Sequence, residues 1–411
     1  MIGVIADDVT GATDVAAALS RAGLRTLLAL TPELDDSGSV SADADAVVIG
    51  LKTRSMPVDD AVRLSLTALS TLQSLGAQQF YIKYCSTFDS TPEGNIGPIT
   101  DAVAEELGVP LVLTTPAAPL HGRTVYQGHL FVGESLLAET HMRDHPVTPM
   151  RESSALRLLT PQTTGEVELL SLDVVRAGVD EVRDRIAAAQ DAGVTHLVAD
   201  ATGEDDLLVL AEAIDGAPLA AGSAGLIGAM AMWHPQSEAE IPAPAPGRTA
   251  ILAGSCSRRT LEQITHFQQT GGASYRLIAG EDESAEQLAE RALRWWDAQP
   301  AEASALIYSS STAAEREGTD PALGALYERA AGVIAAGLNA RGIRRLLIAG
   351  GETSGEVIKA LGTQVAVVGR EAALGAPWIH DTAHGLQMVL KSGNFGDADL
   401  FVDVAREGAL V

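Results

Sequence analysis

The stretch Ile2-Gly3-Val4-Ile5-Ala6-Asp7-Asp8-Val9-Thr10-Gly11-Ala12-Thr13-Asp14 decides the fold, because a short apolar run ends in a polar turn and a helical pattern follows at residues 13–22. A strand that leads into an amphipathic helix is the basic βα unit of a parallel sheet. The same alternation predicts further strands at residues 46–50, 80–83, 111–114, 196–199, 249–253, 305–308, 345–349 and 365–368. It predicts helices at residues 59–75, 174–192, 258–269, 285–296 and 321–341. We therefore predict an α/β fold of largely parallel sheets flanked by helices.

The chain has 411 residues, which is more than one ordinary domain of about 150 residues. Its clearest boundary is Ile241-Pro242-Ala243-Pro244-Ala245-Pro246-Gly247, since alternating prolines favour an extended connector. The alternative is a surface loop within one domain. Because a predicted strand starts directly afterwards, we favour two domains, residues 1–240 and 248–411.

Charge and cysteine content narrow the class of protein. The 28 basic and 54 acidic residues give a net charge of −26, which argues against nucleic acid or an anionic membrane as the partner of the whole surface. Two cysteines, Cys85 and Cys256, match neither a disulfide framework nor a zinc spacing. With no long apolar stretch and no basic leader, the sequence predicts a soluble cytoplasmic protein.

Polar residues follow the predicted strands of the first half, at the edge where α/β folds bind ligands. Asp7 and Asp8 repel each other unless they meet a cation, a metal or ligand hydroxyls, and the alternative is an Asx-rich turn. Residues 50–55 add Lys52 and Arg54, which suit a carboxylate or phosphate. Residues 83–97 add a lysine, several hydroxyls, an aspartate and an asparagine, which suit a polyhydroxylated anionic small molecule.

The second half contains glycine-rich turns instead. They are Gly254-Ser255-Cys256-Ser257, Gly350-Gly351-Glu352-Thr353-Ser354-Gly355 and Lys391-Ser392-Gly393-Asn394-Phe395-Gly396. Paired glycines before a helix, predicted to begin near Ser354, let backbone N–H groups approach a phosphate, although the same residues could merely cap the helix. Neither a Walker loop nor the dinucleotide fingerprint G-x-G-x-x-G occurs.

Metal and nucleophile sites are weaker alternatives. The pairs His141/His145 and His380/His384 are spaced i,i+4 but lack the glutamate of H-E-x-x-H, and we place both in loops. We interpret Cys85 as a small residue that lines a pocket rather than as a nucleophile. Residues 121–129 either reach the ligand or form a solvated loop.

Five motifs are spread over nearly the whole chain: Ile5-Ala6-Asp7-Asp8-x-Thr10-Gly11-Ala12, Lys83-Tyr84-Cys85-Ser86-Thr87-Phe88-Asp89-Ser90-Thr91, Gly122-Arg123-Thr124-Val125-Tyr126-Gln127-Gly128, Gly350-Gly351-Glu352-Thr353-Ser354-Gly355 and Lys391-Ser392-Gly393-Asn394-Phe395-Gly396. Together they resemble the four-carbon acid sugar kinase family. The resemblance implies that residues 1–240 bind a sugar acid and residues 248–411 bind a nucleotide. It also implies that the two domains close on ATP and the acid in a cleft between them.

The resemblance also implies which residues bind the substrate and which bind the nucleotide. Substrate contacts are expected from Asp7, Asp8, Arg54, Lys83, Ser86, Thr87, Asp89 and Asn95. Nucleotide contacts are expected from Ser255, Ser257, Gly350, Gly351, Glu352, Thr353, Gly393 and Gly396. The stretch Arg151-Glu152-Ser153-Ser154 departs from the Thr-Asp-Ser-Asn-like sequence that the resemblance leads us to expect.

The residues and the resemblance both indicate phosphoryl transfer, for which we expect ATP with Mg²⁺. The resemblance implies that the acceptor is the terminal 4-hydroxyl of a four-carbon acid. We expect 3-oxo-tetronate as substrate, with erythronate or threonate as alternatives. Asp8 is the first candidate for the carboxylate that orients or deprotonates the hydroxyl and Asp89 the second, while Lys83 and Arg54 neutralise charge. A non-catalytic sugar-acid binding protein or a sugar-acid dehydrogenase remains as an alternative class. Metal ligands stay unassigned, and a homodimer is left open as the assembly.

Overall fold

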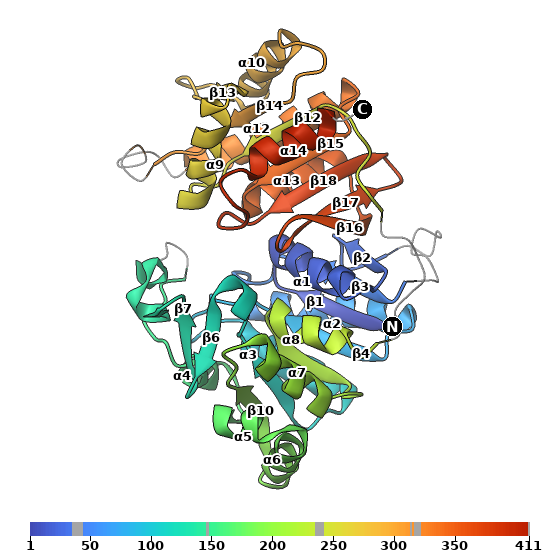
Figure 1. Cartoon of the computed structure of the whole chain (residues 1–411), viewed down its shortest axis with the longest axis vertical. Helices are drawn as coiled ribbons and strands as arrows, with labels where there is room; N and C mark the ends of the chain where they lie inside the picture. The colour runs from blue at the N-terminus through green and yellow to red at the C-terminus, as the bar shows by residue number, and fades with distance from the viewer. Residues whose placement is uncertain (35–43, 145–147, 235–241, 313–314, 316–321, 410–411) are drawn as a thin grey trace. The chain divides into compact units, whose positions relative to one another are not determined.

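The computed structural model describes residues 1–34, 44–144, 148–234, 242–312, 315 and 322–409. The chain divides into two compact units, Met1–Ala239 and Glu240–Val411 (Figure 1). Ile241 of the predicted linker lies outside the described residues, and residues 242–247 are neither helix nor strand. We keep residues 1–240 and 248–411 as the proposed domains.

The first unit contains an eight-stranded sheet in which every neighbouring pair is parallel. Its strand order is β2 (Thr26–Ala29), β3 (Ala46–Gly50), β1 (Ile2–Ala6), β4 (Gln79–Lys83), β11 (Leu219–Gly222), β5 (Val112–Thr115), β10 (Val194–Ala199) and β9 (Glu166–Leu170). The chain leaves β1 toward β2 on one side and later returns to β4 on the other. Such a reversal of direction opens a crevice at the carboxyl ends of the strands.

Helices cover this sheet in two groups. In one group, α1 (Val9–Arg21), α8 (Ala224–Ala231), α7 (Glu204–Ala213) and α6 (Val179–Asp191) contact each other in succession; in the other, α2 (Val58–Ser74) packs on α3 (Ile96–Leu107). Because crossovers between parallel strands are right-handed, the reversal at β1 places α1 and α2 on opposite faces. The helix predicted at residues 174–192 is two helices, α5 (Leu172–Ala177) and α6, because Gly178 interrupts it with a φ of +119°.

A small antiparallel sheet and a short helix complete the first unit. The sheet consists of β6 (Arg123–Tyr126), β7 (His129–Val132) and β8 (Ser135–Leu136), and α4 (Ala155–Leu159) follows it in the chain. We predicted none of these strands, since β6 and β7 are only partly buried and do not form the continuous apolar runs from which we predicted the other strands.

The second unit contains a seven-stranded sheet. Its order is β13 (Ala273–Arg276), β14 (Ala305–Tyr308), β12 (Thr249–Ala253), β15 (Arg345–Ala349), β18 (Leu386–Lys391), β17 (Ala376–Asp381) and β16 (Val365–Ala373). The first five strands are parallel, and β16, β17 and β18 form an antiparallel meander. Both units are therefore α/β folds with largely parallel sheets, as predicted.

Helices flank the second sheet as well. α12 (Ala322–Ala340) packs on α10 (Ala285–Asp297) and α13 (Gly351–Leu361), while α9 (Arg258–Gln269) packs on α14 (Leu400–Ala409). A buried cluster that includes Trp378, Phe401 and Leu347 fills one side of this sheet. In the part of the chain that the structure describes, no helix is long and apolar enough to cross a membrane.

Candidate active site

Three neighbouring strands of the first unit bring the predicted acid-binding residues together. β1 lies between β3 and β4, and both neighbours are parallel to it. Asp7 and Asp8 directly follow β1, Arg54 follows β3, and Lys83 ends β4. These four side chains therefore start at the same edge of the sheet.

Arg54 is the cation that the paired aspartates require. Its Nε lies 2.8 Å from Asp7 Oδ2, its Nη2 lies 3.0 Å from Asp8 Oδ2, and its Nη1 lies 3.7 Å from Asp89 Oδ2. Burial of the guanidinium opposes its charge, but Asp7 and Asp8 outweigh this and raise the pKa of Arg54. One arginine thus balances carboxylates from two separate segments of the chain.

Asp8 has two structural roles in addition to this ion pair. It is the N-cap of α1, and its Oδ1 accepts a 2.6 Å hydrogen bond from the Gly11 N–H. The helix therefore begins at Val9, and our prediction of residue 13 as its start was wrong because the cap precedes the apolar periodicity. Burial raises the pKa of Asp8, but Arg54 and Lys83 act more strongly together, so its pKa is lowered and the carboxylate is ionised at neutral pH.

Gly11 lies where two acids and a lysine converge. A Cβ on Gly11 would lie 2.4 Å from Asp8 Oδ1 and 3.1 Å from Lys83 Nζ. Lys83 is buried, and its Nζ donates a 2.9 Å hydrogen bond to the Tyr84 carbonyl. Among the described residues this is its one hydrogen bond, so two of its three N–H groups are available to a ligand.

The loop after β4 is ordered by its own hydroxyl groups. Thr87 Oγ1 donates to Asp89 Oδ1 at 2.6 Å, and Cys85 Sγ lies 3.0 Å from Thr87 Oγ1. Ser86 stands between them and is half-buried. Asn95 donates from Nδ2 to the carbonyls of Thr53 and Met56, at 2.6 and 2.8 Å, and so ties this loop to the one after β3.

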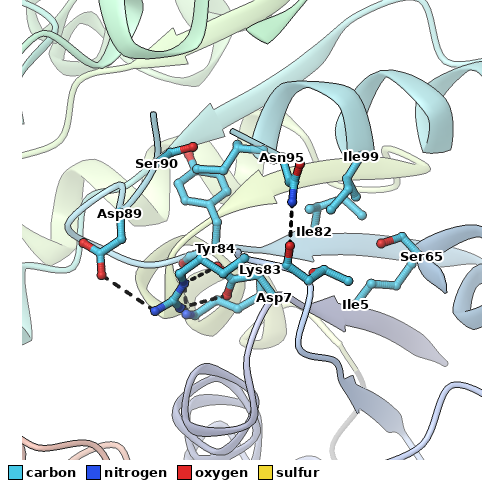
Figure 2. A pocket seen from close by; sticks show the side chains of 13 residues that line it. Ile5, Asp7, Ser65, Ile82, Lys83, Tyr84, Asp89, Ser90, Asn95 and Ile99 are labelled. Atoms are coloured by element: carbon cyan, nitrogen blue, oxygen red, sulfur yellow. Dashed lines mark hydrogen bonds and ion pairs between the residues drawn. The ribbon is translucent and has the colours of Figure 1, made fainter. Parts of the chain in front are cut away.

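A small cavity lies among these side chains, as Figure 2 shows for Asp7, Lys83, Asp89 and Asn95. Its volume of about 20 Å³ holds about one water molecule. A four-carbon acid must therefore lie at its mouth or displace a side chain. Asp8 does not line the cavity, and its side chain is 27% exposed, compared with 12% for Asp7 and 10% for Asp89. Asp8 is thus the most accessible of the three carboxylates.

The predicted nucleotide residues of the second unit meet at the ends of β12, β15 and β18. These strands are adjacent, and Ala349 is in register with Ala253 on one side and with Lys391 on the other. The Gly350 N–H donates to the Lys391 carbonyl, and the Gly254 N–H donates to the Ala349 carbonyl, both at 3.0 Å. Backbone hydrogen bonds thus join the three glycine-rich turns.

Glycine is required at each of these turns. Gly350 has a φ of +129°, which strains any other residue. A Cβ on Gly254 would lie 2.2 Å from Thr353 Oγ1, and a Cβ on Gly393 would lie 2.4 Å from Ser255 Oγ. The turns therefore pack more closely than side chains would allow.

The first turn of α13 offers unpaired backbone donors. The helix begins at Gly351, not near Ser354 as predicted, because Gly350 supplies the cap conformation. Its first backbone bond runs from the Ser354 N–H to the Gly350 carbonyl. Within the described part of the chain, the N–H groups of Gly351, Glu352 and Thr353 have no acceptor. Such a turn binds anions through these donors and the helix dipole.

Ser255, Ser257 and Gly396 occupy supporting positions. Ser257 is the N-cap of α9, and its Oγ also contacts the Gly393 carbonyl. The Ser255 N–H bonds the Ala349 carbonyl at 3.0 Å. Gly396 lies in a turn with a φ of +74°, where Gln263 donates to the neighbouring carbonyls of residues 395 and 397.

Lys391 was quoted in the sequence motif but not assigned to the site. Its side chain is buried, and its Nζ donates to Thr260 Oγ1 and to the carbonyls of Ser392 and Gly393. Burial, with a smaller contribution from Arg259, lowers the pKa of Lys391 to about 7. Only four of the 28 basic residues are lysines, and this scarcity was a signal in the sequence that could have singled out Lys391.

The metal and nucleophile alternatives gain no support. No group of three or more His, Cys, Asp or Glu side chains that could hold a metal occurs among the described residues, and His145 lies outside them. His380 lies within β17 and is buried, so its predicted loop position was wrong. Burial raises the pKa of Cys85 to about 11, which leaves the thiol protonated.

Residues 121–129 form much of the β6–β7 hairpin. The buried Asp200 carboxylate accepts hydrogen bonds from the N–H groups of Gln127, Gly128 and Leu172, at 2.8, 2.8 and 3.1 Å. This part of the Gly122–Gly128 motif therefore fixes a turn. The segment at residues 151–154, whose sequence departs from the one that the resemblance leads us to expect, is held by Glu152. The Glu152 Oε1 accepts hydrogen bonds from the N–H groups of Ser153 and Ser154.

Comparisons with known proteins cover both units. A family model described as a sugar-binding N-terminal domain matches residues 2–230, and one described as a nucleotide-binding C-terminal domain matches residues 250–401. A 3-oxo-tetronate kinase of Pectobacterium atrosepticum is 41% identical, over 99% of both chains. A 3-oxo-tetronate kinase of Salmonella typhimurium is 39% identical, again over 99% of both chains.

Solved structures of related proteins share the fold of this chain. A protein of Salmonella typhimurium LT2 described as a putative tRNA synthase has a TM-score of 0.89 at 37% identity, over 99% of both chains. A Haemophilus influenzae protein has a TM-score of 0.79 at 35% identity, over 99% of this chain and 100% of that one.

Proposed function

Since this chain belongs to the four-carbon acid sugar kinase family and is therefore a sugar-acid kinase that uses ATP, we propose that it phosphorylates the terminal 4-hydroxyl of 3-oxo-tetronate to give 3-oxo-tetronate 4-phosphate. The named substrate follows the relatives, which are 38 to 41% identical. A small-molecule acid and ATP are the partners. We propose that residues 1–240 bind the acid and residues 248–411 bind the nucleotide.

The observation that carries the proposal is the arrangement of the three glycine turns around the first turn of α13. The unpaired N–H groups of Gly351, Glu352 and Thr353 suit the oxygens of a polyphosphate. Gly254 and Gly350 leave no room for side chains between the turns. A protein that only binds a sugar acid has no use for this second, anion-binding arrangement.

The charged residues of the first unit support an acidic substrate. Lys83 is buried and has unused donors, and it lines the cavity with Arg54. We propose that these two cations neutralise the substrate carboxylate and the charge that develops during transfer. We propose that Ser86, Thr87, Asp89 and Asn95 shape the binding surface for the hydroxyl groups.

Mg²⁺ fits this site as a partner of the nucleotide rather than as a resident ion. The described residues contain no cluster of three protein ligands, and Mg²⁺ in kinases is held largely by phosphates, water and one or two carboxylates. Glu352, exposed in the first turn of α13, is a carboxylate available there. When bound, Mg²⁺ would offset phosphate charge.

Asp8 is our proposal for the carboxylate that orients the 4-hydroxyl. The hydroxyl oxygen forms a bond to the γ-phosphorus, the bond from that phosphorus to the β–γ bridging oxygen breaks, and ADP leaves. The hydroxyl proton passes to the carboxylate and then to water. Transfer requires the hydroxyl oxygen and the γ-phosphorus to lie about 3–3.5 Å apart.

A coupled ADP-release assay tests the proposal. The purified chain is assayed with Mg–ATP and with 3-oxo-tetronate, erythronate and threonate stereoisomers, and the product is analysed by mass and by ³¹P coupling. We expect the highest kcat/KM with 3-oxo-tetronate and phosphate on the fourth carbon. Preference for erythronate or threonate would change the substrate and retain the kinase. No ADP release with any of these acids, together with oxidation of an acid in a parallel assay with NAD, would support a dehydrogenase.

A further inference from the structure

Lys391 places a buried positive charge at the phosphate turns. Its three N–H groups have three acceptors: Thr260 Oγ1 at 3.0 Å, the Ser392 carbonyl at 3.0 Å and the Gly393 carbonyl at 2.8 Å. Its own carbonyl accepts the Gly350 N–H. A single residue thus connects the turn after β18 to the turn after β15 and to the start of α9.

The carbonyl of Gly393 is held from several directions. Besides Lys391, the hydroxyls of Thr260 and Ser257 donate to it, the former at 2.9 Å. A trans peptide is planar, and its C=O and N–H point in opposite directions. The three donors therefore also fix the N–H of Asn394, which points away from Lys391.

This N–H has the properties of a ligand donor. Asn394 is exposed, and among the described residues its N–H has no acceptor. Ser255 lies next to the same turn, since a Cβ on Gly393 would lie 2.4 Å from Ser255 Oγ. The free donor thus belongs to the same group of turns as the unpaired N–H groups of α13.

The charge of Lys391 also lacks a protein counterion. No carboxylate of the described residues lies within ion-pair distance of its ammonium, and the charged side chain that acts on it is Arg259, also a cation. Burial without a counterion is unfavourable for an ammonium group. A polyphosphate bound nearby would supply the missing negative charge.

We propose that Lys391 is a positioning residue of the nucleotide site: it holds the Gly393 carbonyl inward so that the Asn394 N–H donates to a phosphate oxygen of the nucleotide. The inference rests on the proposed kinase function and adds a donor and its support to it. It gives the third glycine-rich turn, residues 391–396, a role in phosphate binding.

Selective labelling observes this donor directly. The chain contains three asparagines, Asn95, Asn339 and Asn394, so [¹⁵N]asparagine gives three backbone amide signals from the intact protein. We expect Mg–ADP to shift the Asn394 amide strongly. Asn95 lies in the first unit and Asn339 precedes the amino end of β15, so both serve as internal references. An unchanged Asn394 amide at saturating Mg–ADP would overturn the inference.

Variants test the role of the lysine. We expect Lys391→Met to raise the Kd of Mg–ADP and the KM of ATP by about 10-fold or more, the value of one lost hydrogen bond to a charged group. The KM of the sugar acid should not change. Lys359→Met is the matched control, because Lys359 is an exposed lysine of the last turn of α13.

A second pair of variants covers the case in which Lys391→Met fails to fold. Thr260→Val removes a hydroxyl that bonds both Lys391 and the Gly393 carbonyl, whereas Thr260→Ser keeps it. We expect Thr260→Val to weaken Mg–ADP binding and Thr260→Ser to restore it. Loss of stability with wild-type Mg–ADP affinity in both Lys391→Met and Thr260→Val would show a purely structural role.

The wild-type measurement separates this inference from the proposed function. If the wild-type chain binds neither Mg–ADP nor ATP, the kinase proposal fails, and this inference with it. If it binds them and the variants bind equally well, only the role of Lys391 fails.

Discussion

Replacing Gly350 with alanine should weaken ATP binding more than it destabilises the fold. Gly350 precedes α13 with a φ of +129°, and an alanine Cβ would lie 3.0 Å from the Ser255 nitrogen and 3.1 Å from Thr353 Oγ1. The conformation alone costs about 1–3 kcal/mol for a residue with a side chain. Relief of the contacts must also move either the first turn of α13 or the turn that contains Ser255.

The expected size follows from the donors involved. A hydrogen bond to a charged group contributes about 1.5–3 kcal/mol, so the loss of one backbone N–H to phosphate contact raises the KM of ATP roughly 10- to 100-fold. The KM of the sugar acid should stay close to that of the wild type. ADP release, measured over a range of ATP concentrations at saturating acid, gives both values.

Gly342→Ala is the control for backbone strain. Gly342 has a φ of +84°, but a Cβ there meets nothing within 4 Å. We expect a similar loss of stability in urea for the two variants and a raised KM of ATP only for Gly350→Ala. If Gly350→Ala keeps the wild-type KM while it loses stability, the turn after β15 does not bind the phosphates.

Asp8→Asn should lower kcat about 10²- to 10⁴-fold without changing the KM of ATP, because the amide still caps α1 but cannot accept a proton; near-normal turnover would remove Asp8 from this role and leave the kinase standing. Cys85→Ser should retain activity, and Cys85 should react slowly with iodoacetamide at pH 8, where a thiol whose burial raises the pKa to about 11 is only about 0.1% thiolate; rapid inactivation by reaction at Cys85 would contradict this. The pKa of Lys391 is lowered to about 7 from 10.5 by burial and Arg259, so the unfolded chain binds more protons across that window. The stability of the wild type relative to Lys391→Met should therefore rise by about 1.4 kcal/mol per pH unit between pH 7 and 10.5, measured by urea unfolding; a pH-independent difference would contradict the lowered pKa of Lys391.

The sequence predicted the structure best where an apolar run forms a strand and charged residues or glycines directly follow it. Five-residue, mostly apolar runs such as Ile2–Ala6 and Arg345–Ala349 are strands with the predicted bounds. Asp7, Asp8 and Arg54 were singled out by their charge after a strand, and the structure joins them in one ion-pair network. The glycine turns were found because glycine is the signature of close backbone approach.

Long-range arrangements could not be predicted in the same way. β17 and β18 were missed because their burial depends on pairing with each other and with β15, which the local pattern does not reveal. One bond of the Lys391 ammonium, to Thr260, joins residues 131 positions apart in sequence. Asp200 holds residues of the β6–β7 turn 72 and 73 positions away, so nothing near it in the sequence indicates this role.

The sequence alone also could not show whether a single polar residue supports the fold, binds the ligand or does both. Asn95 was predicted to bind the substrate, and the structure shows that its amide bonds two carbonyls of the loop after β3. Asp8 is at once a helix cap, an ion-pair partner and the most exposed carboxylate of its group. A short polar side chain can serve structure and ligand together, and only the geometry shows how many of its bonds are already used.

A crystal structure of the full chain with Mg²⁺, a non-hydrolysable ATP analogue and a four-carbon sugar acid tests the account most directly. We expect the phosphates within hydrogen-bond distance of the N–H groups of Gly351, Glu352 and Thr353, and the acid beside Lys83 with its terminal hydroxyl facing Asp8. Phosphates bound away from the start of α13 would contradict it.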